Sequence, residues 1–152
     1  MLAECIEGGI LEHRDLALKI AWSFLGKPYR WGGDDPMAGF DCSGFIVELL
    51  RSTGHLDRGI DLTAQGLWDS FAAWEVRVPY NGCLVFWQNY RGTVNHVELC
   101  LDNRHSIGAS GGGGMCISER DAIEQNAYIK IRPFRSRKPI RGFSDPFLSP
   151  LS

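Results

Sequence analysis

Long apolar runs, paired cysteines and a strong excess of either charge are all missing from this chain of 152 residues. No apolar stretch approaches the roughly 18 residues that a membrane-spanning helix needs, so no membrane span is expected. Residues 1–7 lack the basic and apolar regions of a secretory signal peptide, and we therefore expect synthesis in the cytoplasm. The hydrophobic content of 44% is that of a globular protein and excludes a disordered regulator.

The net charge of −2 is too small to indicate a partner, but positive charge gathers at the C-terminal end. Residues 130–152 hold six Lys or Arg against one Asp, whereas residues 1–129 hold ten Lys or Arg against seventeen Asp or Glu. Such a segment can bind a polyanion, either a nucleic acid or an anionic cell-wall polymer. Its arginines alternate with Ile131, Phe134 and Ile140, which favours a half-buried strand and a docked tail. We therefore expect no nucleic-acid partner.

The five cysteines, at positions 5, 42, 83, 100 and 116, are odd in number and include no C-x-x-C pair. This pattern indicates neither a disulfide framework nor a zinc ribbon. Cys83, Cys100 and Cys116 lie in apolar, strand-like runs, where cysteine acts as a small core residue. The possible metal ligands Asp41, Cys42, His96 and His105 have neither helical nor knuckle spacing, so we expect no metal and no cofactor.

Hydrophobic periodicity predicts helices in the first half of the chain and strands in the second. One helix covers about 16–24 and ends at Gly26, one runs from about 42 to 54, and one begins after the N-cap Thr63. Strands are expected at 84–87, 96–101, 105–110, 115–118 and 128–132, with a helical turn capped by Ser118 before the last of them. This order predicts a single α+β domain over 1–152, with a core at about 14–132 and a basic C-terminal extension at 133–152.

Cys42 differs from the other cysteines because it follows a loop rich in Gly and Asp and begins an apolar-periodic helix. Unpaired backbone N–H groups and the helix dipole at such a position favour a thiolate and can lower the pKa of a thiol. Ser43 and Gly44 leave the sulfur uncrowded. These features are consistent either with a nucleophile or with an inert cysteine at a helix start.

A nucleophilic thiol also needs a histidine that takes and returns the proton, and a group that orients that histidine. Of the four histidines, His13 and His55 occupy polar positions and are expected at the surface. His96 begins an apolar strand, where it is either a hydrogen-bonded core residue or a catalytic base. Its pairing with Cys42, one on the helical half and one on the sheet, favours the base.

Two blocks of sequence resemble the signature of the NlpC/P60 cysteine peptidases. The first is Pro28-Tyr29-Arg30-Trp31-Gly32-Gly33 followed by Phe40-Asp41-Cys42-Ser43-Gly44-Phe45. The second is Gly82-Cys83-Leu84-Val85-Phe86-Trp87 followed by His96-Val97-Glu98-Leu99. The resemblance covers about 14–132 and implies a papain-like fold, in which a helical bundle bearing Cys42 packs on a small antiparallel sheet bearing His96.

The resemblance implies hydrolysis of peptide bonds in peptidoglycan stem peptides, commonly between D-γ-glutamate and a diamino acid. Family members shape the substrate site with the residues that match Tyr29, Asp41 and Ser43. Asp41 is expected to bind a free amino group of the substrate, to cap the helix, or to do both. The Cys42 backbone N–H is expected to help bind the oxyanion.

The chain departs from the family pattern on the histidine strand. Members usually have His-Val-Gly there, with a third catalytic residue twelve positions after the histidine, where this chain has Gly108. If 102–104 forms the hairpin loop, Glu98 lies opposite Gly108 and His96 opposite Ser110 on one face of the sheet. We hypothesise that the Glu98 carboxylate fills the space above Gly108 and orients His96. Ser110 or His105 can take that role instead, or Glu98 can face solvent while His96 uses a carbonyl or water.

The expected function is a cysteine peptidase acting on peptidoglycan or muropeptides, with Cys42, His96 and Glu98 catalytic and Tyr29, Asp41, Ser43 and Ser110 binding substrate. The alternatives are a catalytically silent wall-binding or phage-tail module and a Cys–His acyl transferase or amidase. Cytoplasmic synthesis is compatible with this substrate in two ways. The enzyme is either phage-associated or released and acts on the wall, or it trims recycled muropeptides.

Overall fold

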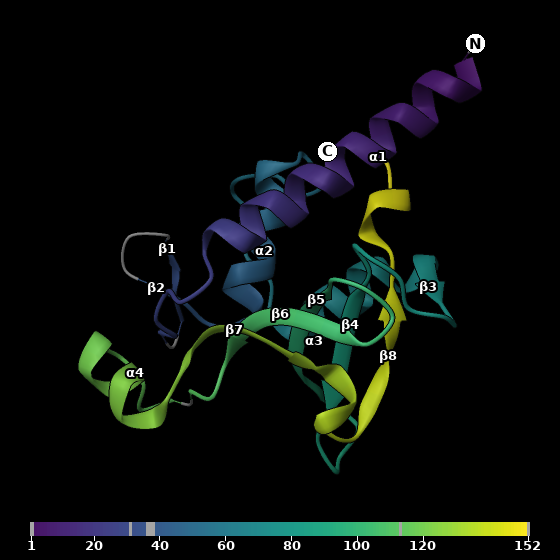
Figure 1. Ribbon diagram of the computed structural model, residues 1–152. Coiled ribbons are helices and arrows are strands. Elements are labelled where there is room, and N and C mark those ends of the chain that lie inside the picture. The colour runs from purple at the N-terminus through teal and green to yellow at the C-terminus, as the bar shows by residue number, and fades with distance from the viewer. Residues whose placement is uncertain (1, 31, 36–38, 113, 152) are drawn as a thin grey trace.

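The computed structural model (Figure 1) describes residues 2–30, 32–35, 39–112 and 114–151, with the side chains of 2–11, 34 and 35 left out. Trp31 and the Cys5 side chain, which the sequence analysis named, lie outside the described part. The described helices are α1 (Leu2–Ser23), α2 (Cys42–Ser52), α3 (Ala64–Phe71) and α4 (Glu119–Gln125), with 3₁₀ turns η1 (Ala72–Trp74), η2 (Phe134–Ser136) and η3 (Pro146–Leu148).

The strands complete an α+β fold, as predicted. A short hairpin pairs β1 (Asp34–Asp35) with β2 (Gly39–Phe40). The main sheet is antiparallel, with the order β3-β8-β4-β5-β6-β7. Its strands are β3 (Glu75–Val76), β4 (Leu84–Gln88), β5 (Val94–Cys100), β6 (His105–Ser110), β7 (Tyr128–Pro133) and β8 (Ile140–Ser144).

Local capping explains where three of the helices begin. The side chains of Asp41, Thr63 and Ser118 accept hydrogen bonds from the third backbone N–H that follows each of them. Each bond satisfies one of the N–H groups that have no partner within the first turn of a helix. The predicted starts of α2, α3 and α4 are therefore confirmed.

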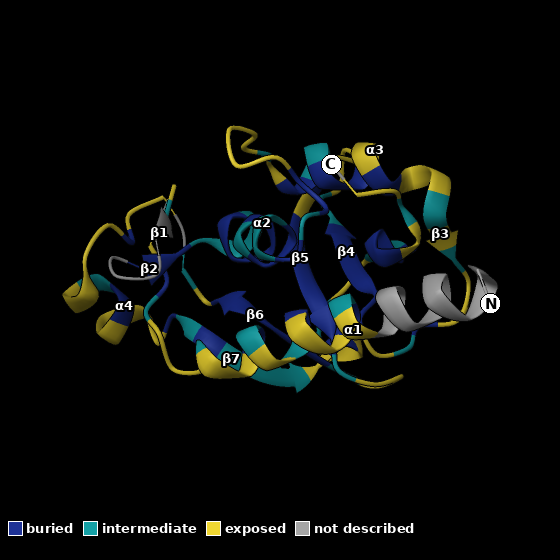
Figure 2. Cartoon of the chain, turned by 90° about the horizontal axis from the view of Figure 1, so that it is seen from above, coloured by how far each residue is buried: buried dark blue, intermediate teal, exposed yellow. Residues whose placement is uncertain are grey.

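The helices α2 and α3 cover one face of the sheet over β5, and α1 packs on α2. Figure 2 shows the buried strands β4 and β5 lying next to α2. Alternation along β4 divides its side chains between two cores. Leu84 and Phe86 face the helices, whereas Val85 and Trp87 pack on the opposite face with Cys83 and Cys100. The predicted core positions of Cys83, Cys100 and Cys116 are confirmed.

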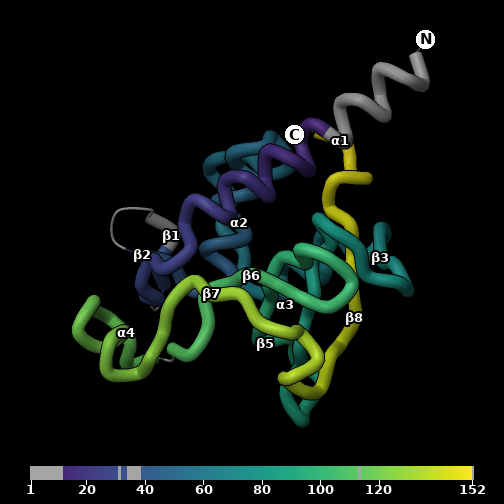
Figure 3. The backbone as a smooth tube through the Cα atoms, viewed as in Figure 1, coloured from purple at the N-terminus to yellow at the C-terminus, as the bar shows by residue number. Residues whose placement is uncertain are grey.

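The C-terminal segment is more than an appended tail. β8 lies between β3 and β4 and is hydrogen-bonded to both, so residues after 133 complete the sheet. Beyond β8, the buried Asp145 carboxylate accepts hydrogen bonds from Arg14 Nη2 at 2.9 Å and from the Tyr80 hydroxyl at 2.5 Å. Figure 3 shows this end of the chain rising beside α1. The segment after residue 133 is thus docked on the rest of the fold through β8, in line with the half-buried strand and docked tail expected from its alternating pattern.

Two further expectations are corrected by tertiary contacts. Residues 115–118 form turn and coil rather than a strand, because the chain leaves β6, passes through α4 and returns as β7. His55, expected at the surface, is 5% exposed because Phe147 packs against its ring and Ser149 lies 3.3 Å from its Nδ1. Among the described residues, no helix has the length and apolar character to cross a membrane.

Candidate active site

Cys42 is the first residue of α2 and stands where that helix meets the sheet. The helix start is held by Asp41, whose Oδ1 accepts from the Gly44 N–H at 2.7 Å and whose Oδ2 accepts from the Gly32 N–H at 2.9 Å. The backbone of Gly33 passes so close that a Cβ on Gly44 would lie 1.9 Å from the Gly33 carbonyl oxygen. Only glycine fits at position 44, and the loop is thereby packed directly against the first turn that carries the thiol.

The β5 strand presents His96 and Glu98 on the same face. His96 Nε2 lies 2.6 Å from Glu98 Oε2, and both side chains are buried. Arg132 of β7 donates from Nη2 to the same Glu98 oxygen at 2.6 Å, and the Ser106 hydroxyl donates to Oε1 at 2.8 Å. The Glu98 carboxylate is therefore fixed by three partners from three strands.

Glu98 lies directly over Gly108. The β5–β6 register pairs Leu99 with Ile107, which is the register expected from the hairpin loop and places Glu98 across from Gly108. A Cβ added to Gly108 would lie 2.3 Å from Glu98 Cγ. The carboxylate side chain thus occupies the volume that a larger residue at position 108 would need.

The short contact with Glu98 favours one tautomer of His96, although Arg132 Nη2 also lies 3.3 Å from His96 Nε2. Arg132 can only donate, so its contact with Glu98 leaves the carboxylate to accept a further hydrogen bond from His96 Nε2–H. A neutral ring protonated at Nε2 leaves Nδ1 as its hydrogen-bond acceptor. Among the described side chains, the hydrogen-bond partners of His96 are Glu98 and Arg132, and no hydrogen bond joins it to Cys42 Sγ.

The pKa of Cys42 contradicts the expectation from the helix start. Burial, followed by the negative charge of Asp41, raises the pKa of the Cys42 thiol to about 12. The backbone N–H groups of Val97 and Ser43 favour the thiolate but do not outweigh these effects. The Cys42 side chain is therefore a neutral thiol at neutral pH.

His96 and Glu98 have pKa values that suit a neutral base beside a charged carboxylate. Burial lowers the pKa of His96, and the hydrogen bond and charge of Glu98 only partly offset this effect. Burial also disfavours ionised Glu98, but the hydrogen bond from His96 and the charge of Arg132 outweigh it and hold the pKa of Glu98 below its ordinary value. At neutral pH the pair is thus an imidazole bound to a carboxylate.

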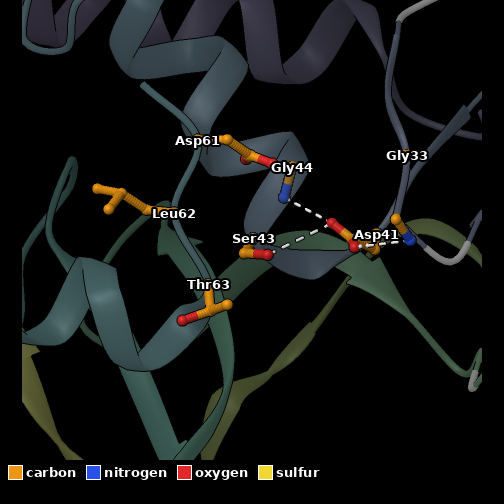
Figure 4. A pocket seen from close by; sticks show the side chains of 8 residues that line it. Gly33, Asp41, Ser43, Gly44, Asp61, Leu62 and Thr63 are labelled. Carbon is orange, nitrogen blue, oxygen red and sulfur yellow. Dashed lines mark hydrogen bonds between the residues drawn. The ribbon is translucent and has the colours of Figure 1, made fainter. Parts of the chain in front are cut away.

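A cleft of about 370 Å³ opens over Cys42 and His96. Its lining includes the predicted substrate residues Tyr29, Asp41, Ser43 and Ser110, together with Arg137 from the segment between β7 and β8. A second hollow of about 260 Å³ adjoins it on the far side of Asp41 and also contains Asp61 (Figure 4). Among the described residues, no three His, Cys, Asp or Glu side chains gather to form a metal site.

The sequence profile of the NlpC/P60 family matches residues 26–133, which include the helix start, the histidine strand and Arg132. The chain belongs to the NlpC/P60 family. The Escherichia coli protein named murein DD-endopeptidase MepH is 32% identical over 145 residues, covering 92% of this chain and 53% of that protein. The Bacillus subtilis protein named probable peptidoglycan endopeptidase LytE is 29% identical over 114 residues, covering 75% of this chain and 32% of that protein.

A solved structure supports the same NlpC/P60 fold. The peptidoglycan hydrolase RipB from Mycobacterium tuberculosis superposes with a TM-score of 0.68 at 22% identity, covering 91% of this chain and 66% of that one. The chain spans about half of the length of MepH and about a third of the length of LytE. The papain-like α+β fold expected from the resemblance is confirmed.

Within this NlpC/P60 site, the other residues that the sequence suggested as orienters of His96 lie elsewhere. His105 Nδ1 binds the Asp102 carboxylate at 3.0 Å in the β5–β6 turn. Ser110 lines the cleft, and its buried hydroxyl has no hydrogen-bond partner among the described residues. The structure therefore brings Glu98, and neither of these two residues, into contact with His96.

Three NlpC/P60 site residues were missed by reasoning from the sequence. Ser106 and Arg132 hold Glu98, and Arg137 lines the cleft. The sequence carried a partial signal for the arginines, because positive charge concentrates after residue 129. The sequence predicts a half-buried strand and a docked tail for this segment, but no local pattern shows that it turns back towards Cys42.

Proposed function

We propose that this chain is a cysteine peptidase that hydrolyses amide bonds in peptidoglycan stem peptides, with Cys42 as nucleophile, His96 as base and Glu98 as the residue that orients His96. The observation that carries the proposal is the 2.6 Å contact between Glu98 and His96 Nε2, beside a thiol at the start of α2. Membership of the NlpC/P60 family, and the endopeptidase names of MepH and LytE, support the same reaction class.

The reaction begins with proton transfer from the Cys42 thiol to His96 Nδ1 as the sulfur attacks the scissile carbonyl carbon. The tetrahedral intermediate carries a negative oxygen, which the Cys42 backbone N–H at the helix start stabilises. His96 then returns the proton to the leaving amine, and a thioester joins the acyl group to Cys42. Water, deprotonated by His96, attacks this thioester and releases the acid and the thiol.

Glu98 acts on this sequence through His96. Its carboxylate keeps the ring in the Nε2–H tautomer and stabilises the imidazolium that forms when Nδ1 takes the thiol proton. Because the pKa of Cys42 is about 12, the thiolate forms during attack rather than beforehand, and the charge of Glu98 lowers the cost of that transfer. Arg132 and Ser106 position the carboxylate for this role.

Substrate is proposed to lie in the cleft between Tyr29, Ser43 and Ser110, with its free amino group near Asp41. Asp41 already accepts hydrogen bonds from two backbone N–H groups, but carboxylate oxygens accept more than one each. We place the cut between D-γ-glutamate and the diamino acid. MepH is named for a DD bond, so the position of the new amine separates the two specificities.

The test incubates purified peptidoglycan, or soluble muropeptides prepared from it, with the protein and with Cys42→Ala as the matched control. New free amines should appear only with the intact thiol, and mass spectrometry of the fragments locates the bond. Preference for intact wall or for muropeptides distinguishes an enzyme of the wall from one that trims recycled fragments. Absence of amine release from both substrates would support the catalytically silent module instead.

A second measurement tests the role of Glu98 separately. Glu98→Gln keeps the size of the side chain but removes the charge that stabilises the imidazolium. We expect kcat/KM to fall by about tenfold or more, by comparison with other orienting carboxylates. A loss below about threefold would leave Glu98 as a structural residue and would return the orienting role to water or to a backbone carbonyl.

A further inference from the structure

Arg137 enters the cleft from outside the segment that matches the family. It follows the η2 turn, between β7 and β8, and its position is fixed through its backbone, because the Trp87 indole N–H donates to the Arg137 carbonyl oxygen at 2.9 Å. The guanidinium carbon lies 5.8 Å from the centre of the Trp87 ring, and the Trp87 ring also packs against His96 at 5.1 Å. The side chain therefore lies beside the catalytic histidine on the wall of the cleft.

Arg137 is half-buried, and although the charge of Glu98 acts on it, no hydrogen bond or ion pair joins its guanidinium to any described residue. The neighbouring Arg132 differs, because its charge is bound by Glu98. Among the described lining residues of the cleft, Arg137 is also the only Lys or Arg. A cation that is partly removed from water without an anionic partner loses solvation that a bound anion would restore.

We propose that Arg137 binds a free carboxylate of the peptide substrate, next to the scissile bond. Guanidinium groups bind carboxylates in a planar, two-pronged geometry that fixes orientation as well as charge. This inference rests on the proposed function and deepens it by adding an anion-binding position to the amine-binding position at Asp41. The favoured substrate is thus a peptide that carries both a free ammonium group and a free carboxylate, rather than a peptide in which these groups are blocked.

The chemistry of the proposed substrate supplies two such carboxylates. A glutamate joined through its γ-carboxyl keeps its α-carboxylate free, only a few bonds from the carbonyl that Cys42 attacks. The diamino acid on the other side of the bond supplies the second carboxylate when it ends the peptide. Replacing either group by a carboxamide removes the charge while keeping the shape, so two amidated peptides distinguish the two sources.

The experiment compares three synthetic peptides: the dicarboxylate, the glutamate α-amide and the diamino acid amide. Each is assayed for kcat/KM with the intact chain, and for binding to Cys42→Ala by calorimetry, so that recognition is measured with and without turnover. We expect one of the amides to be poorer than the dicarboxylate by about tenfold in both measurements, as for the loss of a charge-assisted hydrogen-bonded pair. Arg137→Gln should abolish that preference, and Arg137→Lys should restore part of it.

Arg135→Gln is the matched control. It removes the same charge from an exposed side chain that lies two residues from Arg137 in the sequence. It should keep the preference for the dicarboxylate. Equal losses on all three peptides in Arg137→Gln would overturn the proposal. So would binding to Cys42→Ala, with Arg137 in place, that does not distinguish the three peptides. If binding shows the preference but no peptide is cleaved, the carboxylate site stands and the proposed peptidase activity fails.

Discussion

One added methyl group at Gly108 tests whether Glu98 and Gly108 form a packed pair. In Gly108→Ala the new Cβ would lie 2.3 Å from Glu98 Cγ and 3.0 Å from both Cβ and Cδ of the same side chain. Glu98 cannot simply rotate away, because it is fully buried and its carboxylate is held by His96, Arg132 and Ser106. The substitution therefore has to displace the carboxylate or the strands.

The magnitudes follow from these contacts. Overpacking of a buried site costs about 1–3 kcal/mol, so Gly108→Ala alone should lower the free energy of unfolding by roughly 2 kcal/mol. Glu98→Gly alone should cost about 3 kcal/mol, because it leaves Arg132 without its carboxylate and opens a void above Gly108. In the double variant the methyl group enters the vacated space, so adding Gly108→Ala to Glu98→Gly should cost close to nothing. The two changes are thus expected to be coupled by about 2 kcal/mol.

Urea unfolding of the four proteins, followed by tryptophan fluorescence, measures this coupling. The slope of the transition should stay unchanged, so that differences in the midpoint report stability. Additivity of the two substitutions to within about 0.5 kcal/mol would refute the packed pair. All three variants should also lose kcat/KM, since each one displaces or removes the carboxylate beside His96.

Three further outcomes follow from the site and its supports. In Glu98→Gln the acid limb of the kcat/KM profile should move to lower pH, because the variant loses the interactions that raise the pKa of His96. The acid limb of the wild-type profile should lie below pH 6.5. A shift of the Glu98→Gln limb to higher pH would contradict this reasoning. Asp145→Ala should lower the free energy of unfolding by about 3 kcal/mol in thermal or urea unfolding, because it leaves Arg14 buried without its partner, and a loss below about 1 kcal/mol would refute that role. The rate of Cys42 alkylation by iodoacetamide should rise about tenfold per pH unit between about pH 7 and 9, whereas a plateau in that range would show a low thiol pKa.

The raised pKa of Cys42 changes how labelling experiments are interpreted. A neutral thiol reacts slowly with iodoacetamide at neutral pH whether or not it is catalytic. Slow labelling of Cys42 is therefore expected of an active enzyme with this site, and it does not indicate a silent module. Release of amines from peptidoglycan, with Cys42→Ala as control, is the measurement that separates the two.

The short-range features of this protein were predictable from the sequence because they depend on neighbouring residues. Side chains that cap helices act on backbone groups three residues away, so Asp41 and Ser118 specify their helix starts locally. The β5–β6 turn fixes the register of its hairpin, and with it the position of Glu98 over Gly108. The alternation of apolar residues also placed Cys83 in the core.

Only the tertiary structure decided the features that depend on segments distant in the chain. His55 is buried because residues near 147 fold back over it, and Arg137 enters the cleft because β8 pairs with β4. The pKa of Cys42 also depends on the tertiary structure. The helix start alone would lower the thiol pKa, but burial against other elements raises it. Sequence periodicity and capping describe contacts within a few residues, whereas desolvation and charge pairing depend on which distant groups the fold brings together. The sequence by itself thus determined the helix starts and the β5–β6 register, whereas the tertiary structure buried the Cys42 thiol and brought Arg132 and Arg137 near His96.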